Sequence, residues 1–165
     1  MATPANPYTF WLEAGCYCEV MKLAFGPMGI VPKRGKVGYN LAAHALELLL
    51  KGFLLARGYD RARLKKIGHN LVDALRAASE EGMHEFFDLD PRLEEFVTLL
   101  APLHKRRAFS YPGEIRYATS PASDMATLPR PRDLVAVVEG LLRRLAQHCP
   151  PPGFDRRGAD DDRHS

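Results

Sequence analysis

The sequence predicts an all-α fold, an antiparallel bundle of four to five helices. The prediction starts from residues 40–58, NLAAHALELLLKGFLLARG, where the polar side chains before Arg57 recur at helical spacing. They are Asn40, His44, Glu47 and Lys51. All other positions before Arg57 are Leu, Ala, Phe or Gly, so other helices have to cover most of this helix. The flanking segments repeat apolar residues with the same period, and none alternates as a strand does.

Length and composition agree with one helical domain. The chain has 165 residues, 46% hydrophobic and 26% charged, which is ordinary for a globular protein with a sizeable core. The formal net charge of +3 is too small to name a partner. Cations gather in residues 31–66 and acids in residues 69–100, a pattern that suits head-to-tail association or an anionic ligand. We predict a bundle over residues 1–149 and a disordered polar tail over 150–165.

Cysteines and histidines predict no metal or disulfide framework. Cys16, Cys18 and Cys149 lack a Cys-x-x-Cys spacing, the six histidines show no metal spacing, and we expect no cofactor. The N-terminus does not look like a signal peptide, and no apolar run reaches the ~20 residues of a membrane span. We therefore expect a cytoplasmic protein without a membrane partner. Its excess of arginine over lysine is typical of a GC-rich bacterial source.

The first half of the chain predicts three helices. The first covers Pro7–Phe25, and Gly26-Pro27 ends it because proline cannot donate a backbone hydrogen bond. Residues 27–38, with their glycines, prolines and cations, predict a loop before the central helix. A short helix follows over Asp60–Lys66, capped by Asp60 and ended by Gly68.

The second half predicts three more helical segments. Asn70 is a good capping residue for a helix from Leu71 to about Glu81. Asp90-Pro91 is a good start for the next helix, which Pro102 kinks or shortens. A long loop rich in proline, serine and threonine is predicted over residues 108–131. The last helix runs from about Arg132 to His148.

Three segments, taken in order, resemble the HEPN superfamily, a helical domain of higher eukaryotes and prokaryotes. They are AHALELLLKGFLLARG, IGHNLVDALRAASEEG and LHKRRAFSYP, within a match over roughly residues 10–117. The strongest parts are the Glu47-x3-Lys51 pair and the run Gly68-His69-Asn70-Leu71. The resemblance implies a helical bundle that commonly forms a homodimer. It also implies RNA or nucleotide binding, ribonuclease or toxin activity, or partnership with a nucleotidyltransferase.

The chain departs from two motifs of this family. Ser110-Tyr111-Pro112 stands where members often have Arg-Tyr-Pro. The nuclease branch carries Arg, four to six residues, then His, and three pairs fit that spacing: Arg63 with His69, Arg143 with His148, and Arg157 with His164. We take Arg143 and His148 as the candidate catalytic pair. His148 would move a proton at the 2′-OH or leaving oxygen, and Arg143 would stabilise the phosphorane charge. A charged helix exterior explains the two residues equally well.

Four polar residues form a second candidate site. Glu47 and Lys51 could be an ion pair on a solvated stripe. Alternatively, with His44, they could line a polar groove left open by the neighbouring helices or lie in a dimer interface. His69, at the start of a helix, could cap that helix or bind a ligand.

The best nucleic-acid candidate is the basic run His104, Lys105, Arg106 and Arg107. The nearby Arg116 adds a cation, and Tyr111 and Tyr117 could stack on unpaired bases while the cations hold phosphates. The same cations would also complement the dipole at a helix C-terminus.

These observations leave three hypotheses. The first is a HEPN-like homodimer that binds RNA or a nucleotide through a basic surface, as part of a bacterial toxin–antitoxin or defence system. The second is a metal-independent endoribonuclease whose Arg143/His148 site forms across the dimer. The third is a purely structural dimeric interaction module.

Overall fold

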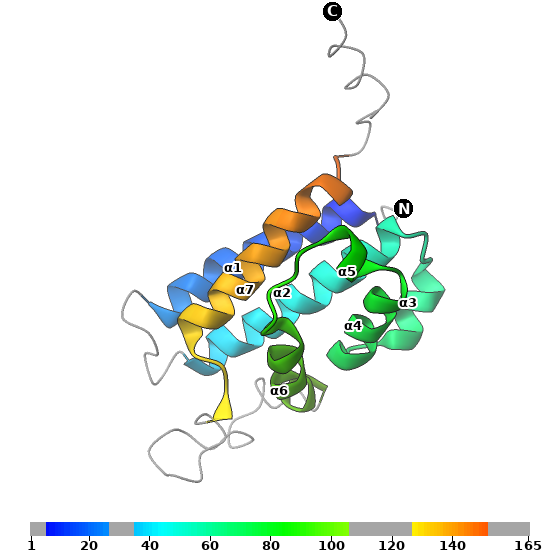
Figure 1. Cartoon of the computed structure of the whole chain (residues 1–165). Coiled ribbons are helices and arrows are strands. Elements are labelled where there is room, and N and C mark those ends of the chain that lie inside the picture. Colours follow the sequence, from blue (N-terminus) through cyan, green and yellow to red (C-terminus); the bar gives the residue numbers. More distant parts are fainter. Residues whose placement is uncertain (1–5, 27–34, 106–126, 152–165) are drawn as a thin grey trace, which may run out of the picture.

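Seven α-helices form a bundle in the computed structural model, which describes residues 6–26, 35–105 and 127–151 (Figure 1). They are α1 (Pro7–Phe25), α2 (Gly35–Ala56), α3 (Arg61–Ile67), α4 (Leu71–Glu80), α5 (Met83–Phe86), α6 (Leu93–Lys105) and α7 (Pro131–Leu145). A 3-10 turn, Ala146–His148, follows α7. No strand occurs in these described ranges, so the all-α prediction is confirmed. No helix among them is long and apolar enough to cross a membrane.

Helix α2 is the centre of the bundle, as its sequence predicts. It contacts α1, α4, α6 and α7, and α1 runs antiparallel to it (Figure 1). Leu46, Leu49, Leu50 and Phe53 have no exposed surface. Full burial of one such side chain stabilises a fold by roughly 1.5–3 kcal/mol, so α2 supplies much of the core.

Helix α1 has the predicted bounds, and its capping residues explain them. The Asn6 side chain accepts from the Thr9 backbone N–H at 2.8 Å, and Gly26 ends the helix with a φ of 70°. The Trp11 indole Nε1–H donates to the Leu142 carbonyl at 2.9 Å, which ties α1 to α7.

Helix α2 begins at Gly35, earlier than predicted, within the segment expected to be a loop. A Cβ built on Gly38 would lie 2.4 Å from Cε1 of Phe25 on α1. Glycine stands there because the two helices approach closely, although the same glycine suggests a loop when only the sequence is read.

The caps of α3 and α4 confirm their predicted starts. The Asp60 carboxylate accepts from the Arg63 backbone N–H at 2.7 Å, and the Asn70 side chain accepts from that of Asp73 at 3.4 Å. The four-residue α5 was not predicted, because one turn is too short to show a period. Its Met83 is fully buried.

Helix α6 starts at Leu93, two residues beyond the predicted start. The Asp90 carboxylate bonds the backbone N–H and the guanidinium of Arg92, so it stabilises the preceding turn instead of capping the helix. The helix continues past Pro102 to Lys105. Most of the predicted loop over 108–131, and nearly all of the predicted tail, lie outside the described residues.

Candidate functional site

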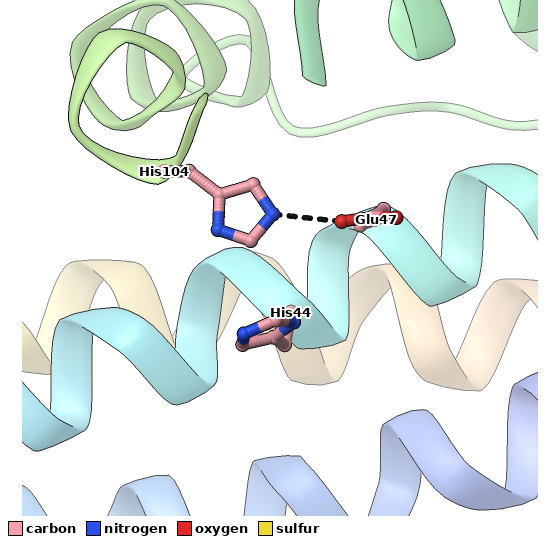
Figure 2. Close-up of side chains that lie close together, drawn as sticks. All are labelled: His44, Glu47 and His104. Atoms are coloured by element: carbon pink, nitrogen blue, oxygen red, sulfur yellow. Dashed lines mark hydrogen bonds and ion pairs between the residues drawn. The ribbon is translucent and has the colours of Figure 1, made fainter. Parts of the chain in front are cut away.

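A buried carboxylate, Glu47 of α2, is the centre of a polar cluster. Figure 2 shows it bonded to His104 of α6, with His44 nearby. The Glu47 side chain accepts hydrogen bonds from Lys51 Nζ at 2.6 Å and from His104 Nε2 at 2.7 Å. His69 Nδ1 lies 3.1 Å from both carboxylate oxygens. Two helices and the turn before α4 therefore converge on one side chain, and we call His44, Glu47, Lys51, His69 and His104 the Glu47 cluster.

Helical spacing and a turn bring these residues together. His44, Glu47 and Lys51 are three and four residues apart, so they share one face of α2. Lys51 Nζ also donates to the Gly68 carbonyl at 2.6 Å, which fixes the α3–α4 turn and holds His69 beside Glu47. The predicted polar stripe is thus covered by other elements, and Glu47 and Lys51 are not a solvated surface pair.

Glu47 remains ionised because its partners outweigh its burial. Burial acts to raise the pKa of this carboxyl, but the hydrogen bonds from His104 and Lys51 lower the pKa to about 2. A buried carboxylate with several charge-assisted hydrogen bonds is a fixed negative centre at neutral pH.

His44 completes the cluster on the side facing α1. Its ring stacks on Tyr17 with 5.6 Å between centroids and meets the ring of His104 edge-on at 4.7 Å. Burial, and then the neighbouring His104, lower the pKa of His44, so its imidazole is neutral at pH 7. Neutral imidazole is the form that binds metal ions.

His44, Glu47 and His104 offer three ligand atoms within 4.8 Å of one another (Figure 2). The sequence predicted no metal spacing, because His104 is 57 residues from Glu47. One signal for its position was available: counting back from His104 by 4, 7 and 11 residues reaches Leu100, Val97 and Leu93, the apolar face of α6.

Exposed residues flank the cluster along the chain. His69 keeps 60% of its side chain exposed. The last turn of α3, just before the turn that contains His69, carries Lys65 and Lys66, and both are exposed. Lys105, also exposed, directly follows His104.

The candidate catalytic pair lies elsewhere. Arg143 is exposed on α7, and the His148 ring packs edge-on against Phe87, with 4.8 Å between centroids. Phe87 in turn contacts Phe53. Phe53 is six residues beyond Glu47, or roughly 9 Å along α2. The structure does not bring these two residues into the Glu47 cluster.

Five residues of the predicted RNA-binding set lie outside the described residues. They are Arg106, Arg107, Tyr111, Arg116 and Tyr117. Their role stays a prediction from the sequence.

Comparisons of the chain with protein-family models, with curated proteins and with solved structures found no match. The resemblance to the HEPN superfamily therefore rests on the sequence segments that carry it.

Proposed function

We propose that this protein is a HEPN-like homodimer that binds RNA or a nucleotide through a basic surface beside the Glu47 cluster. The observation that supports this best is that the ends of two helices, α3 and α6, come close together and both carry cations. The rings of His69, just after α3, and His104, in the last turn of α6, lie 6.1 Å apart. Lys65 and Lys66 precede the first ring, and Lys105 follows the second. Clustered cations of this kind bind phosphates.

His69 is the residue best suited to contact the ligand. Its Nδ1 is oriented by Glu47, and the ring is exposed. When His69 is protonated, Nε2 can donate a hydrogen bond to a phosphate oxygen while Nδ1 donates to Glu47. The buried carboxylate then acts as the group that positions the imidazole.

The basic run continues along the sequence after Lys105. Arg106 and Arg107 follow Lys105 directly, and Tyr111 and Tyr117 supply rings on which bases can stack. In a bacterial cell, the resemblance favours a toxin–antitoxin or defence role with a nucleotidyltransferase-type partner.

Binding of fluorescent single-stranded RNA in EDTA, measured by anisotropy at several salt concentrations, tests the proposal. Lys65→Ala with Lys66→Ala should weaken binding, and the slope of log K against log salt should become shallower by about 0.7 for each lost phosphate contact. Arg130→Ala with Arg132→Ala removes two exposed cations at the start of α7 and is the matched control. Equal losses in both double variants would contradict a localised surface.

The same assay separates the alternatives. RNA cleavage in EDTA that is lost in Arg143→Ala or His148→Ala favours the endoribonuclease. Salt-sensitive binding that Arg106→Ala with Arg107→Ala weakens favours the proposed binding protein. No interaction with RNA or nucleotides at any salt leaves the structural module.

A further inference from the structure

Three members of the Glu47 cluster have the donor set of a transition-metal site. Two imidazoles and one carboxylate, from His44, His104 and Glu47, place their ligand atoms within 4.8 Å of one another. Glu47 is 6% exposed and His104 is 5% exposed. Two histidines and one carboxylate are a common ligand set for zinc and for other first-row dications.

We propose that His44, Glu47 and His104 bind one transition-metal dication of the zinc class. A tetrahedral ion with bonds of about 2.1 Å holds its ligand atoms roughly 3.4 Å apart. The three ligand atoms lie within 4.8 Å of one another, so no pair has to approach by more than roughly 1.4 Å. His104 Nε2 and Glu47 Oε2, now 2.7 Å apart, have to separate by roughly 0.7 Å. Small rotations of the three side chains supply that movement. Three protein ligands leave the fourth position for water or for an anionic oxygen.

The neighbouring contacts are compatible with this ion. Lys51 bonds Oε1 of Glu47, and His104 bonds Oε2, so an ion held by Oε2 leaves the Glu47–Lys51 ion pair in place. The ion takes the place of the hydrogen between His104 Nε2 and Oε2, and that proton moves to Nδ1 of His104 or to solvent. Tyr17 stacks on the His44 ring and fixes its plane, which is the part that outer contacts play in metal sites.

A metal ion also has a path from solvent to the site. His44 is only partly buried. His69, which also contacts the carboxylate, is largely exposed. An ion can thus reach Glu47 from solvent although the carboxylate itself is buried.

The test uses the full chain, stripped with EDTA and titrated with Zn²⁺ and with Co²⁺. We expect one equivalent of Zn²⁺ by calorimetry, and visible Co²⁺ absorption bands of a four- or five-coordinate site with nitrogen and oxygen ligands. His44→Ala and His104→Ala should each weaken binding at least about tenfold. His84→Ala, which removes an exposed histidine bonded to Ser79, is the matched control and should bind as the wild type does.

The outcomes separate the site from its alternatives. Far-UV circular dichroism checks that each variant is folded, and His44→Asn, at the least buried ligand, is the second variant if His104→Ala does not fold. A titration in which the protein does not bind one equivalent of Zn²⁺ would overturn the proposal. So would binding that persists in folded His44→Asn, binding lost in His164→Ala of the polar tail, or sulfur-to-cobalt absorption from a cysteine. None of these results depends on whether RNA binds.

Discussion

At the scale of single residues, the charge of Glu47 is the least ordinary feature of the molecule. Lys51, His69 and His104 all contact this one carboxylate. Loss of one partner from a buried ion pair typically costs 3–5 kcal/mol, because the other charge stays buried without compensation. The cluster therefore couples the ionisation of Glu47 to the stability of the fold.

Glu47 should make stability depend on pH in the acid range. Its pKa falls from 4.5 to about 2 on folding, so the folded state favours the ionised form. That stabilisation is fully present above pH 4.5 and is lost as pH falls towards 2. We expect Glu47→Gln to unfold with a free energy lower by roughly 3 kcal/mol at pH 7. Urea denaturation at pH 7, 4.5 and 3 should show the gap from the wild type narrowing with acid.

Glu95→Gln, at an exposed position of α6, is the control and should track the wild type at each pH. A Glu47→Gln protein with the same acid sensitivity as the wild type would show that other carboxyls cause it.

What the sequence could predict about the cluster follows from how far apart its members are along the chain. His44, Glu47 and Lys51 share a helix face, so period alone placed them together. His69 was singled out by its place before a helix start. The closeness of His104 depends on how α6 packs on α2, which no local spacing records. From the sequence alone, His104 belongs to the basic run instead.

At the scale of the elements, two helical glycines, one on α1 and one on α2, differ in whether the structure has room for a Cβ. A Cβ on Gly38 would meet the Phe25 ring at 2.4 Å, whereas one on Gly15 would find its nearest atom, Cδ2 of Leu142, at 3.9 Å. Both lie within helices, where alanine is preferred over glycine by up to ~1 kcal/mol.

Gly38→Ala should therefore destabilise the protein by about 1–3 kcal/mol, because the buried ring of Phe25 has to shift. Gly15→Ala should stabilise it by a few tenths to ~1 kcal/mol. Thermal and urea unfolding of both variants measure the difference. A stabilising Gly38→Ala would mean that α1 and α2 do not approach as closely as described.

The helix ends show why sequence prediction succeeded at some elements and not at others. Asn6, Asp60 and Asn70 act on backbone groups three residues away, so their effect is local and can be read from sequence. The start of α2 depends instead on its contact with α1, which no local pattern records. At the turn before α6 the competing partner is local, because Asp90 bonds Arg92 two residues on, whereas the sequence pattern predicts a helix cap instead.

At the scale of the whole molecule, α1 presents one apolar row to solvent. Leu12, Val20 and Leu23 are 48%, 50% and 74% exposed, and Cys16 lies between them on the same side. Their spacing of four, four and three residues places them on one helix face. The buried residues of α1, such as Ala14 and Met21, face α2 and α7 instead. A second copy of the chain can cover such a row by a symmetric contact, each α1 on the other.

We expect Val20→Lys with Leu23→Lys to convert the proposed homodimer into a monomer. Each protomer loses two apolar contacts, so four side chains at roughly 1.5 kcal/mol or more weaken the dimer by about 6 kcal/mol. That corresponds to about four orders of magnitude in Kd. Sedimentation of the wild type and the variant at micromolar concentration measures it. Far-UV circular dichroism should show the variant to be as helical as the wild type, because both side chains are exposed to solvent in the single protomer. Its unfolding midpoint should be lower only by the stabilisation that dimerisation gives the wild type, and that difference should grow with protein concentration. Val72→Lys, at an exposed valine of α4, should leave the dimer intact. A wild-type protein that sediments as a monomer at 100-fold higher concentration would exclude this interface, and with it any site shared between two copies across α1.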